Sequence, residues 1–264
     1  MKHVLTIAGS DSCGGAGIQA DLKTFSALKV YGMSVITAVT AQNTLGVQKV
    51  LNITPEIVEA QIDSIFGDIS VDAVKIGMVS EKIVIQTISQ ALKKHDAQNI
   101  VLDPVMVSKS GYALMEPESI EFLISYLMPL AMVVTPNIFE AEQITGRLIE
   151  KVADMEIAAA MIHSLGPRNV IVKGGHLLGD AIDVLYDGTT YLQISRSRVN
   201  TRHTHGTGCT FSSAIAAQLA KGKSVKEAFF EAKEYISGAI TNSFSIGEGV
   251  GPTHHFFRFY TNEE

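Results

Sequence analysis

The chain has 264 residues, of which 46% are hydrophobic and 18% charged, and its formal net charge is -6 at pH 7. This balance excludes a disordered or tail-like protein. Lys and Arg form no long run, so neither nucleic acid nor an anionic membrane surface is expected as a partner.

The N-terminal segment, MKHVLTIAGSDS, predicts one short apolar strand. Its apolar part is too short for the core of a signal peptide, and no apolar run in the chain approaches the length of a membrane span. Cys13 and Cys209 lie in glycine-rich segments and not at the paired spacing of a disulfide framework. We therefore expect a cytoplasmic protein.

Short β-rich runs alternate with helical stretches along most of the chain. Continuous apolar runs predict buried strands at 4–7, 34–39, 73–77, 99–103, 132–136 and 169–174. The stretches between them predict helices at 18–30, 55–66, 81–95, 117–129, 138–146 and 152–165. Further on, Asp187-Gly188 predicts the turn of an antiparallel hairpin, followed by helices at about 208–221 and 224–243.

This order of elements predicts an α/β fold in one domain spanning residues 1–264. Its sheet is expected to be mostly parallel, with helices on both faces and an antiparallel edge. In such sheets ligands bind beyond the carboxyl ends of the strands. The loops expected there are AGSDSCGGAG, TAQNT, GMVS, DPVMVSKSG, TPNIFEAE and KGGH.

The segment HTHGTGC (203–209) places two glycines directly ahead of a predicted helix. Glycines at this position let consecutive backbone N–H groups point at one spot, where the helix N-terminus adds a partial positive charge. The segment therefore fits an anion hole, in which the helix dipole would lower the pKa of the Cys209 thiol. The alternative is a plain tight turn at Gly206 and Gly208, with Cys209 buried as a small apolar residue.

Asp103, Asn137 and Glu140 follow buried strands in DPVM and TPNIFEAE. Carboxylate oxygens of this kind hold Mg²⁺, directly or through water. Taken alone, Asn137 and Glu140 are better explained as the cap and first turn of a helix. Lys173, in KGGH, either reaches a phosphate oxygen or is a solvated charge at a strand end.

Three further features concern ligand choice. Gln42 in TAQN carries a donor and an acceptor, which suits the edge of an amino-heterocycle, although such an amide is more often a loop hydrogen bond. Gly15–Ala20 match the loosened dinucleotide pattern G-x-G-x-x-A, but they start far beyond the first strand, and no acidic residue ends the second. His203 and His205 lack a third ligand at a suitable spacing, so no zinc site is expected.

In combination these segments resemble a known family. AGSDSCGGAGIQADLKTFSALKVYGMSVITAVTAQNTLGV, KIGM, LDPVM, TPNIFEAE, KGGH, HGTGCTFSSAIAA and GPTHHF occur in an order that covers nearly the whole chain. The chain resembles the bacterial hydroxymethylpyrimidine/phosphomethylpyrimidine kinases of thiamine biosynthesis, within the ribokinase-like superfamily. The resemblance implies a three-layer α/β/α sandwich with a mostly parallel sheet and an antiparallel edge, and a homo-oligomer, namely a dimer. It also implies phosphorylation of 4-amino-5-hydroxymethyl-2-methylpyrimidine and of its monophosphate by ATP with Mg²⁺.

The resemblance also implies roles for particular residues. The catalytic residues and anion hole would be Cys209, Gly206, Thr207, Gly208 and Lys173. The pyrimidine would contact Gln42, Gly9, Asp21, Met78 and Val105. The metal and phosphate region would contain Asp103, Glu140 and Asn137. Many superfamily members have aspartate where this chain has Cys209, and cysteine is usual in the pyrimidine kinases and in some pyridoxal kinases.

Two other classes stay open at the level of sequence. A pyridoxine or pyridoxal kinase would use the same anion-hole chemistry, although a pyridine ring lacks the aminopyrimidine edge that Gln42 suits. A non-catalytic vitamin-binding module is less favoured, because it would not need Asp103, Glu140, Lys173 and Cys209 together. A nicotinamide enzyme is the weakest interpretation.

Overall fold

The computed structural model describes residues 1–108, 111–175, 177 and 179–260. In this part of the chain the strands form one nine-stranded sheet, ordered β3-β2-β1-β4-β5-β6-β7-β8-β9. The strands are β1 (His3–Asp11), β2 (Tyr31–Asn43), β3 (Gly46–Asn52), β4 (Ala73–Ile76), β5 (Ile100–Leu102), β6 (Val133–Val134), β7 (Val170–Lys173), β8 (Ala181–Tyr186) and β9 (Tyr191–Arg196). Strands β1, β2, β4, β5, β6 and β7 are parallel, whereas β3, β8 and β9 pair antiparallel with their neighbours.

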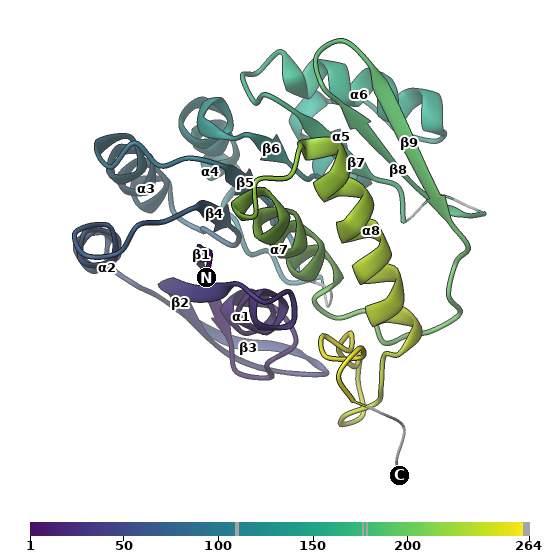
Figure 1. The fold of residues 1–264 in the computed structure, drawn as a ribbon, viewed down its shortest axis with the longest axis horizontal. Helices are drawn as coiled ribbons and strands as arrows, with labels where there is room; N and C mark the ends of the chain where they lie inside the picture. The colour runs from purple at the N-terminus through teal and green to yellow at the C-terminus, as the bar shows by residue number, and fades with distance from the viewer. Residues whose placement is uncertain (109–110, 176, 178, 261–264) are drawn as a thin grey trace.

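Helices cover both faces of the sheet (Figure 1). The helices are α1 (Gly17–Ala27), α2 (Pro55–Phe66), α3 (Lys82–Lys94), α4 (Pro117–Phe122), α5 (Ile138–Thr145), α6 (Val152–His163), α7 (Thr207–Ala220) and α8 (Val225–Thr241). Helices α1, α7 and α8 share one hydrophobic cluster with the sheet, and helices α2, α3, α5 and α6 share the other. The molecule is therefore built in three layers.

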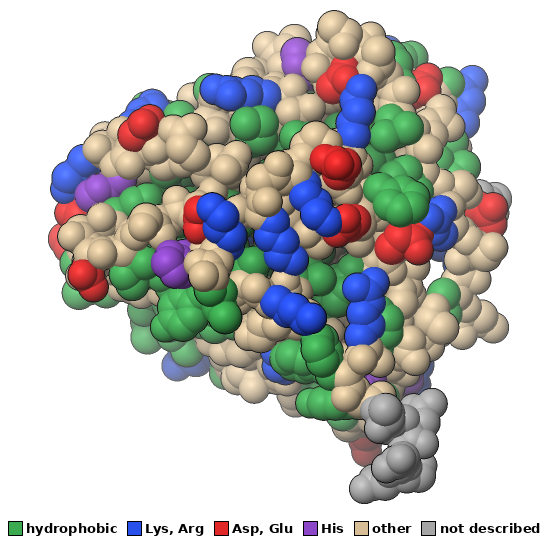
Figure 2. Space-filling model, viewed as in Figure 1, with side chains coloured by type: hydrophobic (Ala, Val, Ile, Leu, Met, Phe, Trp, Pro, Cys, Tyr) green, Lys and Arg blue, Asp and Glu red, His purple; other side chains and the backbone are tan. Residues whose placement is uncertain are grey.

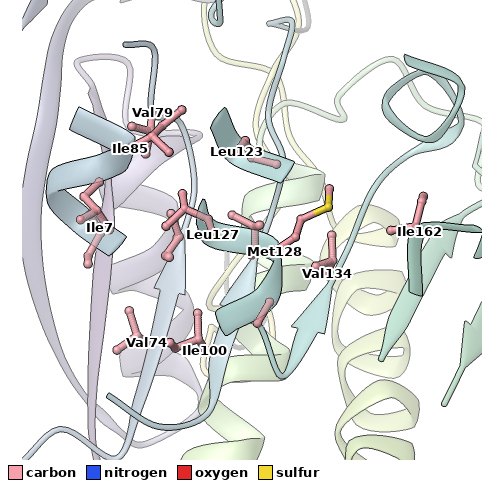
Figure 3. Close-up of a cluster of buried hydrophobic side chains, with 14 of the residues drawn as sticks. Ile7, Val74, Val79, Ile85, Ile100, Leu123, Leu127, Met128, Val134 and Ile162 are labelled. Atoms are coloured by element: carbon pink, nitrogen blue, oxygen red, sulfur yellow. The ribbon is translucent and has the colours of Figure 1, made fainter. Parts of the chain in front are cut away.

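The two-residue period of a strand decides which side chains enter each cluster. In β4, Val74 and Ile76 face the cluster that contains Leu127 and Ile162, part of which is drawn in Figure 3. Lys75 lies between them and so faces the layer of α1 and α7. A lysine is thereby placed inside the molecule, where burial without a paired anion would be costly.

The predicted α/β class and the mostly parallel sheet are confirmed, as are the six buried strands and the hairpin at Asp187-Gly188. Strand β3 was not predicted, because it is a half-exposed edge strand without a continuous apolar run. The helix expected over 117–129 leaves α geometry after Phe122. It continues as a π turn, η1 (Leu123–Leu127), and a 3₁₀ turn, η2 (Met128–Leu130), which contains the helix-breaking Pro129.

The single-domain boundary at residues 1–264 stays a prediction, which the continuous sheet supports. Within the expected loops, residues 109–110 and His176 lie outside the described residues. On the face viewed in Figure 2, Lys and Arg side chains gather near the middle with Asp and Glu among them. Two ion pairs involve acidic residues of α8: Lys223 with Glu231 and Arg196 with Glu234.

Candidate active site

A cavity of about 800 Å³ opens where the parallel strands end. The loops after β1, β4, β5, β6 and β7 contribute to its lining, as do the end of β2 and the first turn of α7. The residues given a catalytic, substrate-binding or metal-binding role from the sequence all line it except Asp21. They are Gly9, Gln42, Met78, Val105, Asp103, Asn137, Glu140, Lys173, Gly206, Thr207, Gly208 and Cys209.

The first turn of α7 forms one wall of the cavity. Gly206, which precedes it, has φ 78° and ψ 8°, and a Cβ there would collide with the Gly15 carbonyl oxygen. Only glycine fits this position. A Cβ on Gly208 would lie 3.5 Å from both Asp103 Oδ2 and Lys173 Nζ, so the turn faces the Lys173 ammonium. Its N–H groups have no intrahelical acceptors and suit a phosphate.

Cys209 is half-buried in the same turn and lines the cavity. Burial raises the pKa of its thiol to about 11, and the carboxylates of Asp21 and Asp103 act in the same direction. The Lys75 charge and a hydrogen bond from the Gly17 N–H oppose this shift. The lowered thiol pKa expected from the helix dipole is therefore wrong, because loss of solvent around the sulfur outweighs the groups that favour a thiolate.

Lys173 lies between two carboxyl groups. Its Nζ donates to Asp103 Oδ1 at 2.8 Å and lies 4.0 Å from Glu140 Oε2. Burial alone would raise the pKa of Asp103, but Lys173 and Lys75 hold it below its usual range. Burial raises the pKa of Glu140 to about 7 in spite of Lys173. This end of the cavity thus holds a fixed ion pair beside a carboxyl group that titrates near neutrality.

Asn137 and Glu140 form a capping box at the start of α5. The Glu140 N–H donates to Asn137 Oδ1 at 2.9 Å, and the Asn137 N–H donates to Glu140 Oε2 at 2.7 Å. The helix-start explanation of this pair is therefore confirmed. Since both residues also line the cavity, the cap holds the Glu140 carboxyl group beside Lys173 and does not exclude a second role.

The donors in this region fit magnesium in chemistry. Asp103 and Glu140 are buried carboxyl groups at the cavity wall, and Mg²⁺ is typically held by one or two carboxylates together with water and substrate phosphates. Among the described residues, no group of three or more His, Cys, Asp or Glu side chains is arranged to hold a metal ion by itself. A metal here would depend on ligands from a phosphate substrate.

Asp21 lies beneath the cavity. Its Oδ2 accepts from Lys75 Nζ at 2.9 Å and from Thr6 Oγ1 at 2.6 Å, and its Oδ1 accepts from Ser213 Oγ at 2.7 Å. Asp21 and Lys75 are both fully buried, and Lys75 lines the cavity from below. The sequence analysis did not select Lys75. A lysine within a strand buried on both faces was the available signal, because such a charge requires a partner.

The residues predicted to contact the pyrimidine line the same cavity, except Asp21. A Cβ on Gly9 would lie 3.0 Å from Met78 Sδ, so these two residues form one close-packed wall. Val105 follows Asp103 in a tight turn, in which its N–H donates to the Asp103 carbonyl at 2.8 Å. Gln42 follows an irregularity in the β2–β3 pairing, and its backbone exchanges two 2.8 Å hydrogen bonds with Ser12.

A further side of the cavity was not predicted from sequence. It is lined by residues of β8, β9 and α8 and of the segment after β9, among them Asp183, Arg196, Arg198, Lys233, Ile236 and Ile240. Lys233 Nζ donates to Asp183 Oδ2 at 2.7 Å, and both residues are buried. No local motif marks these positions, because their elements meet only through the fold.

No helix in the described part of the chain is long and apolar enough to cross a membrane.

A family model described as phosphomethylpyrimidine kinase matches residues 11–254. The hydroxymethylpyrimidine/phosphomethylpyrimidine kinase of Rhizobium meliloti is 53% identical over 97% of both chains.

Two other proteins extend the comparison. A thiamine biosynthesis bifunctional protein of Geobacter sulfurreducens is 49% identical over 96% of this chain, which spans 52% of that protein. The structure of Bacillus subtilis pyridoxal kinase in complex with ADP superposes with a TM-score of 0.92 and 45% identity, over 98% of this chain and 100% of the other.

Proposed function

The chain belongs to the phosphomethylpyrimidine kinase family, and we propose that it phosphorylates 4-amino-5-hydroxymethyl-2-methylpyrimidine and then the resulting monophosphate. ATP is the phosphoryl donor, and the product is the pyrimidine diphosphate used in thiamine diphosphate biosynthesis. The observation that carries the proposal is the meeting of a phosphate-binding turn and a heterocycle-binding edge in one cavity. Gly206–Cys209 lie on one side of it and Gln42 on another.

Phosphoryl transfer has a loose transition state, so catalysis depends mainly on positioning and on neutralising charge. The N–H groups of Gly208 and Cys209 and the Lys173 ammonium bind the transferring group. The substrate oxygen forms a bond to the terminal phosphorus, while the bond from that phosphorus to the bridging oxygen breaks and ADP leaves. In the first step, the hydroxyl proton passes to the Cys209 sulfur.

Cys209 must lose its own proton before it can accept one. Because burial raises the thiol pKa to about 11, the fraction of thiolate depends on the groups that oppose this shift. The Lys75 ammonium and the Gly17 N–H are two such groups, and both residues line the cavity. Proton transfer late in the reaction tolerates a small thiolate fraction, since little proton abstraction is needed early.

Magnesium belongs to the proposal as the ion that accompanies ATP. Asp103 and Glu140, with Asn137 fixing the Glu140 side chain, are the residues that would hold it, directly or through water. When bound, the ion neutralises charge on the phosphate oxygens. Lys173 lies between the two carboxyl groups, where its positive charge offsets their mutual repulsion.

A pyridoxal kinase is the second candidate, favoured by the likeness to the Bacillus subtilis enzyme in complex with ADP. That relationship supports a shared phosphoryl-transfer machinery. The two substrates differ at the ring edge, where an aminopyrimidine offers a ring nitrogen beside an exocyclic amine. Gln42 can pair with both groups, which favours the pyrimidine.

The test is phosphate transfer from MgATP to three acceptors: hydroxymethylpyrimidine, its monophosphate and pyridoxal. We expect the pyrimidine to be converted to the monophosphate and then to the diphosphate, with slower transfer to pyridoxal. Preference for pyridoxal would replace the first proposal with the second. Absence of transfer to all three acceptors, with nucleotide binding retained, would indicate a non-catalytic binding module.

We also propose a cytoplasmic homodimer. Leu45 and Leu51, in the β2–β3 hairpin at the sheet edge, are 64% and 67% exposed, and exposed apolar edges favour pairing with another chain. Light scattering of the wild type and of Leu51→Lys tests the assembly. A monomeric wild type would contradict it. Both cysteines are free, in keeping with a reducing compartment, and cell fractionation tests the location.

A further inference from the structure

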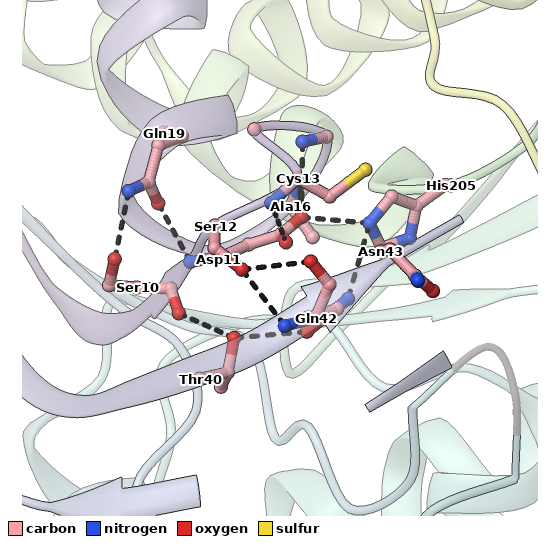
Figure 4. Close-up of polar contacts among 12 residues, drawn as sticks. Ser10, Asp11, Ser12, Cys13, Ala16, Gln19, Thr40, Gln42, Asn43 and His205 are labelled. Carbon is pink, nitrogen blue, oxygen red and sulfur yellow. Dashed lines mark hydrogen bonds and ion pairs between the residues drawn. The ribbon is translucent and has the colours of Figure 1, made fainter. Parts of the chain in front are cut away.

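His205 lies between the glycine-rich loop and Gln42 (Figure 4). Its Nε2 is 2.8 Å from Asp11 Oδ2 and 3.4 Å from the Gln42 side-chain amide. All three residues line the cavity, although 194 positions separate Asp11 from His205. A Cβ on Gly15 would collide with the His205 ring, so the loop packs directly against the imidazole.

The surroundings of Asp11 determine which His205 nitrogen carries a proton. Asp11 accepts hydrogen bonds from the backbone N–H groups of Cys13, Gly15 and Ala16, at 2.8, 3.0 and 2.8 Å. These bonds, together with His205, hold the pKa of Asp11 below its usual value although burial would raise it. An ionised carboxylate can only accept, so His205 Nε2 must carry a proton and donate it.

This proton decides how the Gln42 amide is oriented. Because the His205 Nε2 proton is donated to Asp11, this nitrogen has no lone pair left to accept an N–H from the Gln42 amide 3.4 Å away. The amide oxygen, which can share the same N–H at longer range, therefore suits the end of Gln42 that faces His205. The other end of the amide lies 3.3 Å from Thr40 Oγ1, whose own proton goes to the Ser10 carbonyl at 2.9 Å. Thr40 Oγ1 can therefore accept from the amide nitrogen, and every donor in the cluster then meets an acceptor.

We infer that His205, held by Asp11, is a positioning residue that sets the orientation of Gln42 and thereby the substrate ring. With its oxygen beside His205, Gln42 accepts a hydrogen bond from the exocyclic amine of an aminopyrimidine. That amine then lies on the side of the cavity formed by α7. The Gln42 amide nitrogen donates to the ring nitrogen on the side of Thr40. This inference rests on the proposed pyrimidine substrate and adds a residue and a ring orientation to it.

Two variants of His205 differ by one methylene group and form a matched pair. His205→Gln keeps an N–H at the reach of Nε2, whereas the shorter side chain of His205→Asn does not reach Asp11 Oδ2. For the wild type and both variants, KM and kcat are measured for hydroxymethylpyrimidine and for ATP. We expect His205→Asn to raise the pyrimidine KM by about tenfold, because the amide loses its fixed partner. His205→Gln should stay within about threefold, and the KM for ATP should change little in both.

A double-mutant cycle separates positioning from general support of the fold. Placed in a Gln42→Leu background, His205→Asn should add less than about a twofold further loss in kcat/KM. An equal further loss in that background would overturn the inference, as would a His205→Gln variant as impaired as His205→Asn. If His205→Asn does not fold, Thr40→Val takes its place in the cycle, because it removes the other partner of the amide.

A second measurement needs no substrate. In ¹⁵N spectra the side-chain NH₂ signals of Gln42 are identified by their loss in Gln42→Leu. They should move in His205→Asn and move less in His205→Gln, and unchanged signals in His205→Asn would overturn the inference. A wild type that phosphorylates no aminopyrimidine, with the signals behaving as expected, would overturn the proposed substrate alone.

Discussion

Cys209 is the residue whose chemistry depends most on its neighbours. Burial raises its pKa to about 11, while the Lys75 ammonium, anchored on Asp21, acts in the opposite direction. The protonation state of the proposed base therefore depends on burial, which favours the thiol, and on the Lys75 charge, which favours the thiolate. Removing the sulfur should affect the chemical step more than the binding of the ring, because the backbone donors of α7 and the Gln42 amide remain.

Replacement of Cys209 by Ala should lower turnover by about a hundredfold or more, the typical loss on removing a general base. Binding of hydroxymethylpyrimidine, measured by calorimetry, should be nearly unchanged. Cys13→Ala is the matched control, since Cys13 is the other cysteine and does not line the cavity. Near-normal turnover in Cys209→Ala would mean that the thiol has only a structural role and is not the general base.

Gln42 is the residue that we propose distinguishes one substrate ring edge from another. Gln42→Leu should lower kcat/KM for the pyrimidine by about tenfold or more, because a matched donor and acceptor are lost and the polar edge of the substrate is left unpaired. The loss with pyridoxal should be smaller, since that ring has no matching edge. The measurement is the ratio of kcat/KM between wild type and variant on each substrate. Equal losses would mean that Gln42 only supports the loop.

Substitution of Glu140 tests the proposed role of this residue in holding magnesium. Glu140→Gln should weaken magnesium-dependent activity, and added Mg²⁺ should restore part of it, because an anionic ligand or orienter of bound water is lost. The carbonyl of glutamine can still accept from the Asn137 N–H, so the melting temperature should change little. Because the pKa of Glu140 is about 7, the apparent magnesium affinity of the wild type should rise between pH 6 and pH 8. A magnesium titration unchanged by Glu140→Gln would leave this residue with its capping role alone.

At the scale of elements, the start of α7 depends on contacts with segments distant in the sequence. Gly206 packs against the Gly15 carbonyl oxygen of the glycine-rich loop. The His205 N–H donates to the Gly251 carbonyl at 3.0 Å, and the Thr253 N–H donates to the His205 carbonyl at 3.3 Å. The first turn of α7 is therefore held between the loop that contains Gly15 and the segment that contains Gly251 and Thr253.

Gly206 and Gly208 provide a matched pair of substitutions with different expected results. Gly206→Ala should destabilise the protein by more than about 1 kcal/mol, because it combines a positive φ with a backbone collision. Gly208→Ala meets only ordinary contacts at 3.5 Å and should fold normally, yet its methyl group lies beside Asp103 and Lys173. It should therefore raise the KM for ATP more than it lowers stability. Denaturant melts and ATP titrations measure the two effects, and similar stability losses in both variants would contradict this assignment.

At the scale of the whole molecule, the C-terminal segment closes the layer of α1, α7 and α8. Buried His255 lies there with its Nε2 3.0 Å from Thr210 Oγ1 of α7, and the Tyr235 hydroxyl of α8 donates to its carbonyl at 2.7 Å. Burial, with nearby positive charges, lowers the pKa of His255 to about 3. The folded protein therefore keeps this imidazole neutral where the unfolded chain would protonate it.

This difference predicts a dependence of stability on pH. Between about pH 6.5 and pH 3 the unfolded chain binds the proton more readily, so stability is full above pH 6.5 and is lost as the pH falls through that range. His255→Gln keeps a polar atom near Thr210 but does not titrate. Chemical denaturation at pH 7.5 and pH 5 should show a smaller loss on acidification in the variant than in the wild type. Equal losses would mean that other groups cause the acid sensitivity.

Much of the fold is determined by patterns that are local in sequence. Continuous apolar runs identify strands such as Ile100–Leu102 because a strand buried on both faces has no position for solvent-facing residues. Asp187-Gly188 identifies its hairpin because Asp187 accepts the Thr189 and Thr190 N–H groups of the same turn. The capping box at Asn137 is equally local. Strand β3 cannot be predicted in this way, because this edge strand is only partly buried and its residues form no clear apolar pattern.

The same distinction between local patterns and long-range contacts applies to the residues of the candidate site. Glycines before a helix and polar residues at strand ends single out Gly206, Gly208, Asp103 and Lys173, because backbone geometry and chain order bring them to one edge of the sheet. Only the tertiary structure decides that Asp11 meets His205, that Lys75 pairs with Asp21, and that α8 lines the cavity. Those contacts join segments separated by up to 194 positions. Their free energy depends on burial and on the exclusion of water, which arise when the layers pack and which no local pattern records.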